Sequence, residues 1–424
     1  MSDLLMNIGW PHTANVCVVG LGYVGMPMMF ALAKAGYKVF GVDRAEDKVA
    51  KFNAGECYLE HVDPAMLKGC LDDGACAFGS IDDVPPCDVY LVCVPTPVDK
   101  DRIPDVSFVD AAMADVLRVA PPGSLVVLES TVEPGTTRSY VDKAHGVLLA
   151  YSPEREDPGN PHYWTGNTPK LVGGVTRDAL EAAVALYSAV CGVVIPVASP
   201  EVAEMAKLFE NTFRLVNVAL ANELKVVCEA VGLDVWDVIK ASDTKPFGFK
   251  AFWPGPGISG HCLPVDVHYF KRTANQAGAD TPIVVAAEGY CRSMPARVVQ
   301  KVAEALNGVG QPVGATRVLI IGLAYKRDVG DVRESYARPI VAGLKRLGAG
   351  VVVHDPLVRE LHDVAVSMGV EAVDVLNESI LYAADVVVVL TDHKCIDWQM
   401  VCEHSNLIVD TRNVIPVGEN VIKA

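Results

Sequence analysis

The sequence predicts an α/β protein in which two doubly wound, parallel-sheet domains are joined by a central helical region with one long helix. Short apolar runs alternate with amphipathic stretches from Asn15 to about Val197. More than thirty residues then lack any strand signal, and the alternation returns after Gly308. Such alternation is typical of parallel strands connected by helices. The predicted domains cover residues 1–198, 199–307 and 308–424.

The long helix is predicted from Pro200 to Val231. Ser199 or Pro200 can start the helix, and Gly232 can end it. Apolar residues recur between these ends at helical spacing, and a mainly helical pattern continues to about Asn307. The predicted strands cover residues 16–19, 38–42, 89–94, 125–128 and 147–151 before the helix, and 317–321, 350–354, 386–390 and 407–409 after it.

Composition excludes several classes of protein. The net charge of −16 argues against a nucleic-acid-binding surface, and no apolar run approaches the ~18 residues of a membrane helix. The first fifteen residues lack a basic start followed by an apolar core, so we expect no secretory signal. The twelve cysteines form no CxxC pair, so no metal site is predicted. We expect reduced thiols and a cytoplasmic location.

A glycine-rich turn follows the first predicted strand and predicts a dinucleotide site of the Rossmann type. Gly20 would allow the tight turn, Gly22 the approach of the pyrophosphate, and Gly25 close packing of helix on strand. Asp43 ends the next strand, where a carboxylate binds ribose hydroxyls and repels a 2′-phosphate. The expected cofactor is therefore NAD, although the neighbouring Arg44 weakens the preference over NADP.

Further residues are expected to line the cofactor crevice, because ligands of such sheets bind at the carboxyl ends of strands. Tyr23 and Val24 lie between the glycines of the turn. Pro95 and Thr96 follow one predicted strand, and Thr131 follows another. The two threonines could equally be turn-forming hydroxyls.

Cys262 lies in a glycine-rich and proline-rich segment, Gly255 to Asp266, and predicts a second chemical function. A hydride acceptor and a nucleophilic thiol in one protein suggest oxidation of an alcohol to an aldehyde, capture as a thiohemiacetal, and oxidation to a thioester. Hydrolysis then gives an acid. An alcohol dehydrogenase that stops at the carbonyl needs no thiol.

Together these motifs resemble the nucleotide-sugar 6-dehydrogenase family, whose best-known member oxidises UDP-glucose to UDP-glucuronate. Residues 151–160 and 244–249 are most similar to the UDP-N-acetylglucosamine 6-dehydrogenases of surface-polysaccharide pathways. The resemblance implies a UDP-sugar-binding carboxyl domain. The matching segments, in order, are Gly20–Gly25, Ser130–Thr137, Ser152–Arg155, Lys207 with Asn211, Cys262 with Asp266, and Gly322–Lys326 with Asp331–Ser335.

The resemblance makes Cys262 the nucleophile and gives the long helix a catalytic face. Lys207, Asn211 and Arg214 follow at i, i+4 and i+7, which usually marks a solvated polar stripe. In the family, the first two positions stabilise negative charge on the reacting oxygen, as alkoxide and tetrahedral intermediates require. Arg214 is expected to hold substrate.

Asp266 matches the residue that the family assigns to activation of water. It could instead cap a helix over residues 267–274. The resemblance gives Thr131 and Glu154 roles in positioning water and substrate, and Arg155 a place in the substrate loop.

The carboxyl-terminal signature supplies Lys326, expected on the UDP phosphates, and Arg333, expected near the cofactor. The chain departs from the family pattern at two positions. Ser259 replaces a glycine that lies against the sugar, so we expect it to affect sugar choice. Val267 replaces a proline and is expected to change only the loop.

Two other functions remain open from the residues. A two-electron hydroxyacid dehydrogenase would leave the Cys262 motif and the last domain unexplained. A nucleotide-sensing regulator would not need Lys207, Asn211, Cys262 and Asp266 together. The family resemblance also implies at least a homodimer, formed through the central helical region.

Overall fold

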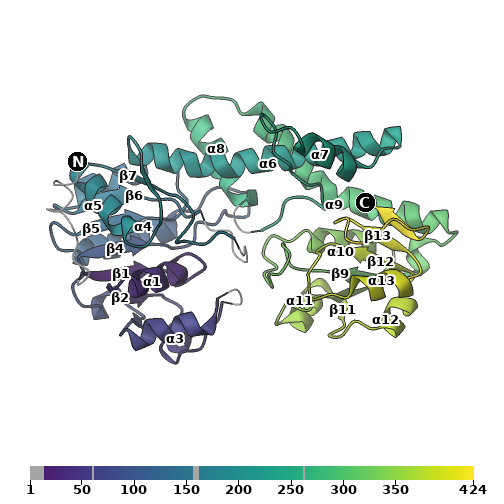
Figure 1. Ribbon diagram of the computed structural model, residues 1–424, viewed down its shortest axis with the longest axis horizontal. Helices are drawn as coiled ribbons and strands as arrows, with labels where there is room; N and C mark the ends of the chain where they lie inside the picture. Colours follow the sequence, from purple (N-terminus) through teal and green to yellow (C-terminus); the bar gives the residue numbers. More distant parts are fainter. Residues whose placement is uncertain (1–13, 60–61, 156–161, 261–262) are drawn as a thin grey trace. The chain divides into compact units, whose positions relative to one another are not determined.

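The computed structural model describes residues 14–59, 62–155, 162–260 and 263–424. The chain forms two compact units. The first contains Met1–Glu210 and Val265–Ala279, and the second contains Asn211–Pro264 and Asp280–Ala424 (Figure 1). None of the helices in the described part of the chain combines the length and apolarity needed to cross a bilayer.

The first unit contains an eight-stranded sheet with the order β3-β2-β1-β4-β5-β6-β7-β8. The run β3-β2-β1-β4-β5-β6 is the strand order of a dinucleotide-binding sheet. The pairing is parallel except between β6 and β7, which are antiparallel. The strands are β1 (Asn15–Val19), β2 (Lys38–Val42), β3 (Cys76–Phe78), β4 (Val89–Val92), β5 (Leu125–Leu128), β6 (Leu148–Tyr151), β7 (Lys170–Gly174) and β8 (Val194–Pro196).

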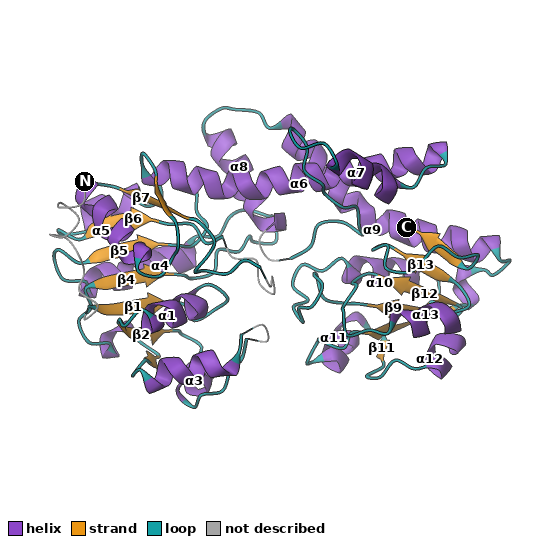
Figure 2. Ribbon diagram, in the orientation of Figure 1, coloured by secondary structure: helices purple, strands orange, loops and turns teal. Residues whose placement is uncertain are grey.

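Helices cover both faces of this sheet (Figure 2). On one face Val16 and Val18 of β1 pack in a core with α1, α3 and α5. On the other face Cys17 and Val19 pack in a core with α4. The apolar residues of β1 thus alternate between two buried faces, as expected for a doubly wound sheet. The helices are α1 (Gly25–Lys34), α2 (Glu46–Asn53), α3 (Pro64–Asp72), α4 (Ser107–Val119) and α5 (Arg177–Ser188).

The long helix α6 (Pro200–Val231) has the predicted bounds. Gly232 follows it with a φ of 74°, a conformation that favours glycine and ends a helix. Leu208 of α6 packs against Val265 and Tyr269 within the first unit. The other helices of the central region are α7 (Val235–Asp243), α8 (Leu263–Gln276) and α9 (Pro282–Gly308).

The second unit contains a parallel six-stranded sheet with the order β11-β10-β9-β12-β13-β14. Val318 and Ile320 pack with α9, α10 and α11, whereas Leu319 and Ile321 pack with α12 and α13. The elements are β9 (Arg317–Ile321), α10 (Ala337–Arg346), β10 (Gly350–His354), α11 (Leu361–Met368), β11 (Glu371–Ala372), α12 (Glu378–Ala383), β12 (Val386–Val389), α13 (Trp398–His404), β13 (Ile408–Asp410) and β14 (Val421–Lys423).

The predicted α/β class with two sheets and a helical region is confirmed. The first sheet is not wholly parallel, because β7 returns antiparallel to β6. The sequence prediction also omitted β3, β7, β8, β11 and β14, which contain two to five residues each. Strands this short carry too few residues for a periodic pattern to emerge.

Candidate active site

The glycine-rich turn after β1 has the geometry that a dinucleotide requires. Gly20 has a φ of 100°, and a Cβ there would lie 2.6 Å from the carbonyl oxygen of Cys93. A Cβ on Gly25 would lie 1.9 Å from the carbonyl oxygen of Gly20, so helix α1 packs directly on the turn. A Cβ on Gly22 would meet nothing within 4 Å. That open side, next to the N-terminus of α1, fits a pyrophosphate.

Asp43 is fixed at the end of β2 by the same turn. Its Oδ2 accepts a hydrogen bond of 2.9 Å from the Leu21 amide, and its Oδ1 accepts one of 2.9 Å from the Ala45 amide. A carboxylate has about four acceptor positions, so both oxygens can still accept ribose hydroxyls. Arg44 points to Asp115 at 3.3 Å, and its side chain is 71% exposed.

Tyr58 is a neighbour of the turn that the sequence did not indicate. Its hydroxyl donates a 2.7 Å hydrogen bond to the Leu21 carbonyl. Burial, followed by the charge of Asp43, raises the Tyr58 pKa. The tyrosine therefore remains a neutral donor that supports the turn.

The segments after β4 and β5 lie beside each other, because these strands pair in register. Ser130 ties them together by donating a 2.7 Å hydrogen bond to the Val94 carbonyl. Thr96 is buried at 6% exposure, whereas Thr131 is partly exposed. Both predicted threonines thus lie at the carboxyl edge of the sheet.

Glu204 of α6 holds the loop that follows Thr131. Its carboxylate accepts hydrogen bonds of 2.6 Å from the Gly135 amide and 2.9 Å from the Thr137 amide. Burial raises the pKa of Glu204, and these two amides oppose that shift. In the sequence, Glu204 could have been recognised as a site residue only from its position three residues before Lys207, on the same face of the helix.

Lys207 and Glu154, two predicted site residues, are in contact. The Lys207 ammonium donates a 2.6 Å hydrogen bond to the Glu154 carbonyl oxygen. Arg155, which is expected to bind substrate, pairs with Glu210 at 2.6 Å and donates to the Pro169 carbonyl at 2.8 Å. Arg155 therefore orders the loop that carries Glu154.

A buried network of charged side chains contacts the Glu154 carboxylate. Lys170 of β7 lies 2.7 Å from the carboxylate of Glu129 and 3.4 Å from that of Glu154. The Tyr187 hydroxyl donates a 2.5 Å hydrogen bond to Glu129. Burial lowers the Lys170 pKa, but the two carboxylates outweigh burial and raise it, so the lysine stays charged.

Asp266 lies inside the first turn of α8, which begins at Leu263. The alternative that it caps a helix starting at residue 267 is therefore wrong, because the helix begins earlier. Its side chain is buried at 3% exposure. Tyr151 is also in this unit, and burial followed by the charges of Glu204 and Asp266 raises its pKa.

The segment that leads to Cys262 packs on aromatic rings of the second unit. Gly257 has a φ of 128°, and a Cβ there would lie 2.2 Å from the Tyr336 ring. Gly260 has a φ of 97°, and a Cβ there would lie 2.7 Å from the Tyr325 ring. Cys262 itself lies outside the described residues. These glycines let the backbone lie flat on the two tyrosines.

Ser259, between these glycines, has a defined partner. Its hydroxyl oxygen accepts a 3.3 Å hydrogen bond from the amide of Tyr336, at the start of α10. A serine hydroxyl also has one hydrogen to donate. Arg412 reaches the same segment, because a Cβ on Gly255 would lie 3.0 Å from its guanidinium.

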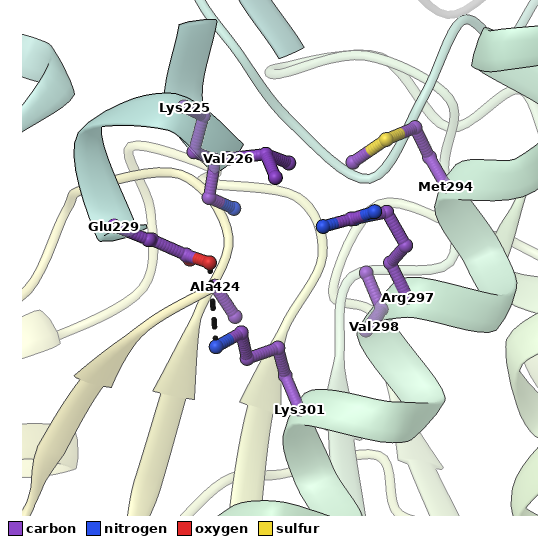
Figure 3. A pocket seen from close by; sticks show the side chains of 8 residues that line it. All are labelled: Lys225, Val226, Glu229, Met294, Arg297, Val298, Lys301 and Ala424. Atoms are coloured by element: carbon purple, nitrogen blue, oxygen red, sulfur yellow. Dashed lines mark ion pairs between the residues drawn. The ribbon is translucent and has the colours of Figure 1, made fainter. Parts of the chain in front are cut away.

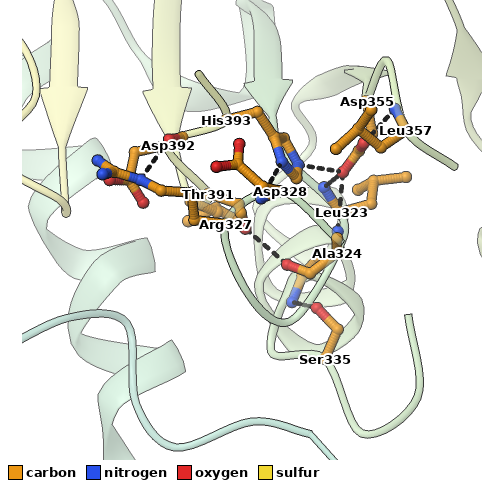
Figure 4. A network of polar contacts seen from close by, with 12 residues as sticks. Leu323, Ala324, Arg327, Asp328, Ser335, Asp355, Leu357, Thr391, Asp392 and His393 are labelled. Carbon is orange, nitrogen blue, oxygen red and sulfur yellow. Dashed lines mark hydrogen bonds and ion pairs between the residues drawn. The ribbon is translucent and has the colours of Figure 1, made fainter. Parts of the chain in front are cut away.

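The signature loop after β9 repeats the backbone pattern of the glycine-rich turn. The Gly322 amide donates to the His354 carbonyl at 2.8 Å, as the Gly20 amide donates to Val42 at 2.7 Å. Asp355, at the end of β10, accepts from the Leu323 and Ala324 amides at 2.7 and 2.8 Å (Figure 4). Asp355 thus corresponds to Asp43 in position.

In this second turn the carboxylate of Asp355 is in contact with a histidine side chain of the protein. The Nε2 atom of His393 lies 3.2 Å from Asp355, and its Nδ1 accepts a hydrogen bond from the Asp328 amide at 3.0 Å (Figure 4). Arg333 pairs with Asp331 at 2.6 Å. The loop that carries Lys326 is therefore anchored at Asp328.

The remaining predicted residues of the long helix belong to the second unit. Asn211 is partly buried and Arg214 is exposed, both on α6. Lys207 and Asn211 are one helical turn apart, so their side chains lie on one face of α6.

Comparison with known proteins agrees with this fold and cofactor turn. Three models of the UDP-glucose/GDP-mannose dehydrogenase family match the chain: the NAD binding domain at residues 14–191, the central domain at 201–290 and the UDP binding domain at 319–417. The chain belongs to this family of NAD-dependent nucleotide-sugar dehydrogenases.

Relatives cover nearly the whole chain. UDP-N-acetyl-D-mannosamine dehydrogenase of Pyrococcus horikoshii is 31% identical over 95% of this chain and 97% of its own. The solved structure of UDP-D-ManNAc dehydrogenase from the same organism has a TM-score of 0.85, covering 96% of this chain and 98% of that chain. NDP-N-acetyl-D-galactosaminuronic acid dehydrogenase of Ralstonia nicotianae is 31% identical over 94% of this chain and 96% of its own.

Proposed function

We propose that this enzyme oxidises the C6 hydroxyl of a UDP-N-acetylhexosamine to the uronic acid in a four-electron reaction through Cys262. The observation that carries the proposal is the Lys207 ammonium, held at 2.6 Å on the Glu154 backbone in the unit that contains the cofactor turn. A fixed cation of this kind stabilises a developing alkoxide. The two-electron alternative gives no role to Cys262.

NAD would be held by the Gly20–Gly25 turn and by Asp43, and it would supply the hydride acceptor for the two oxidations. The Cys262 thiolate adds to the aldehyde carbon, and Lys207 and Asn211 stabilise the oxyanion of the thiohemiacetal. After the second oxidation the carbon is a thioester. Asp266 removes a proton from water, which attacks the thioester and releases the carboxylate and the thiol. The balance is one alcohol, one water and two NAD⁺ consumed for one carboxylic acid, two NADH and two protons.

The stoichiometry tests this mechanism directly. We expect two NADH for each sugar consumed, measured by absorbance together with quantified acid product. One NADH per sugar, with an aldehyde or ketone as product, would establish two-electron chemistry. No NADH with any UDP-sugar would favour a nucleotide-binding regulator.

Replacement of Asp43 tests the cofactor turn. We expect Asp43→Ala to weaken NAD binding by about tenfold or more and to narrow the preference for NAD over NADP, because the variant loses the ribose acceptor and the repulsion of a 2′-phosphate. Titration of both cofactors measures the two affinities. Asp115→Ala is the control, since it frees the exposed Arg44 without touching the turn. An unchanged affinity ratio in Asp43→Ala would place the ribose elsewhere.

The choice of sugar rests on two kinds of support. Residues 151–160 and 244–249 favour UDP-N-acetylglucosamine. The relatives described above are named for N-acetylmannosamine and N-acetylgalactosaminuronic acid. All three are N-acetylated sugars, so we propose UDP-N-acetylglucosamine or UDP-N-acetylmannosamine ahead of UDP-glucose. Comparison of kcat/KM for the three UDP-sugars decides among them.

Ser259 is the proposed determinant of that choice. Its oxygen accepts a hydrogen bond from the Tyr336 amide, and its hydroxyl hydrogen can in addition be donated to the sugar. We expect Ser259→Gly to broaden sugar choice, with the preferred sugar losing roughly 1–3 kcal/mol of its advantage. The measurement is kcat/KM for each sugar in both proteins. If the ratios of kcat/KM between sugars are equal in the two proteins, Ser259 binds only the start of α10 and does not select the sugar.

We propose domains at residues 1–198, 199–307 and 308–424. We also propose that the central domain forms a homodimer. Exposed apolar side chains recur along α6 at helical spacing, namely Phe213, Leu220, Val227 and Val231, which are 45 to 62% exposed. Such a stripe on one helix face is typical of helix association. Light scattering of the wild type and of Leu220→Glu measures the oligomeric state.

A further inference from the structure

A small pocket lined by cations lies in the second unit, between α6, α9 and the end of the chain after β14. Lys225 and Glu229 come from α6, and Arg297 and Lys301 come from α9 (Figure 3). The nitrogen atoms of Lys225 and Arg297 point into the space between the helices (Figure 3). No residue predicted for catalysis lines this pocket.

Three cationic side chains, Lys225, Arg297 and Lys301, line the pocket together with one acidic side chain, Glu229. Lys301 pairs with Glu229 at 3.3 Å and with Glu304 at 3.3 Å. The side chains of Lys225 and Arg297 make neither a hydrogen bond nor an ion pair within the described residues, and Lys225 is only 7% exposed. Burial disfavours the charged form of Lys225, and an anion beside its ammonium would offset that cost.

Asp410, the other carboxylate near Lys225, is already engaged. Its Oδ2 lies 2.9 Å from the Lys423 ammonium and accepts a hydrogen bond of 2.9 Å from the Ile415 amide. Its Oδ1 accepts a 2.8 Å hydrogen bond from the Arg412 amide. Asp410 therefore cannot serve as the missing partner of Lys225.

We propose that this pocket binds an inorganic oxyanion of the phosphate type between Lys225 and Arg297. The guanidinium presents paired donors that match two oxygens of such an anion, and the ammonium supplies a compact charge. The cavity measures about 10 Å³, which is room for one group the size of a water molecule. One oxygen of the anion would enter beside Lys225 while the others remain at Arg297.

The site is separate from the predicted catalytic residues of α6. Lys225 is 14 residues beyond Asn211 on α6, which corresponds to about 21 Å along the helix axis. The proposed anion therefore lies away from Lys207 and Asn211. The proposal is independent of the reaction that the enzyme catalyses.

The protonation of Lys225 gives the site a pH dependence. Burial lowers its pKa to about 8, with Lys301 and Arg297 lowering it further and Glu229 and Asp410 opposing them. An unfolded lysine has a pKa of about 10.4. The cost of the buried charge is thus fully present below pH 8 and is relieved as the pH rises towards 10.4, because the unfolded state then binds more protons.

The test is thermal unfolding of the full chain with phosphate or with chloride at equal ionic strength, at pH 7. We expect phosphate to raise the Tm of the wild type by a few degrees, and Lys225→Met and Arg297→Gln to lose that shift. Lys240→Met, which changes an exposed lysine on α7, is the matched control and keeps it. A shift that persists in Lys225→Met would place phosphate at a nucleotide site and overturn the proposal. No shift in the wild type would also overturn it.

A second measurement keeps the proposal testable if one variant folds poorly. Calorimetric titration of the wild type with phosphate should give an affinity that falls several-fold between pH 7 and about 9.5, as Lys225 loses its proton. Without phosphate at pH 7, Lys225→Met should unfold at a higher temperature than the wild type, because the uncompensated charge is gone. A pH-independent affinity would exclude Lys225 as a ligand.

Discussion

The Cys262→Ser variant is expected to lose acid production by a factor on the order of 10³ or more, while NAD still binds. A serine hydroxyl is a far poorer nucleophile than a thiolate in this setting, and it cannot form a thioester that water readily hydrolyses. The substitution leaves the predicted cofactor residues, the glycine-rich turn and Asp43, unchanged. Acid product is measured at saturating NAD.

Cys395→Ser is the matched control for this experiment. Cys395 is an exposed thiol of the second unit, and its replacement should leave acid production unchanged. Acid formation at the wild-type rate in Cys262→Ser would refute the covalent mechanism. A loss in Cys395→Ser as large as that in Cys262→Ser would mean that general thiol loss, rather than the nucleophile, explains the result.

The second large effect is expected at Lys170. Lys170→Met should reduce the free energy of unfolding by roughly 3–5 kcal/mol, because it leaves the buried carboxylate of Glu129 without its cation. It should also lower kcat of the remaining folded enzyme, since Lys170 lies 3.4 Å from the Glu154 carboxylate. Denaturant unfolding and steady-state kinetics measure the two effects separately.

A double variant distinguishes this ion pair from general loss of packing. Glu129→Gln with Lys170→Met should be less destabilised than the sum of the two single variants, because no buried charge remains uncompensated. The glutamine oxygen can still accept the Tyr187 hydrogen bond. Lys68→Met, at an exposed pair with Asp72, is the control and should change stability by less than about 1 kcal/mol. Additive losses at Glu129 and Lys170 would contradict the proposed coupling.

The cofactor turn could be predicted in detail because its constraints are local. Gly20, Gly22 and Gly25 are each required by the backbone within a few residues. A Cβ on Gly20 or Gly25 would collide with nearby backbone, whereas the side of Gly22 is open. The bounds of α6 follow from Pro200 and Gly232 for the same reason. Asp43 was found because the carboxyl end of the second strand lies beside the turn in any sheet of this type.

Other parts of the candidate site could not be found this way. Glu129 and Tyr187 are 58 residues apart in the sequence, and Glu129 and Lys170 are 41 residues apart. Each occurs as a single polar residue in an apolar or mixed stretch, with no periodic signal. The start of α8 at Leu263, before Asp266, was also not predicted, so the alternative that Asp266 caps a helix is wrong.

The sequence alone determined the fold class, the long helix, the NAD turn and the family, since these depend on local backbone preferences, on strand and helix periodicity and on ordered motifs. The tertiary structure decided which charges are buried together. Lys170 meets two carboxylates, whereas Lys225 shares its pocket with two other cations and one carboxylate. The physical reason is that the free-energy cost of burying a charged lysine depends on the groups that packing places around it. Those groups come from distant elements of the chain.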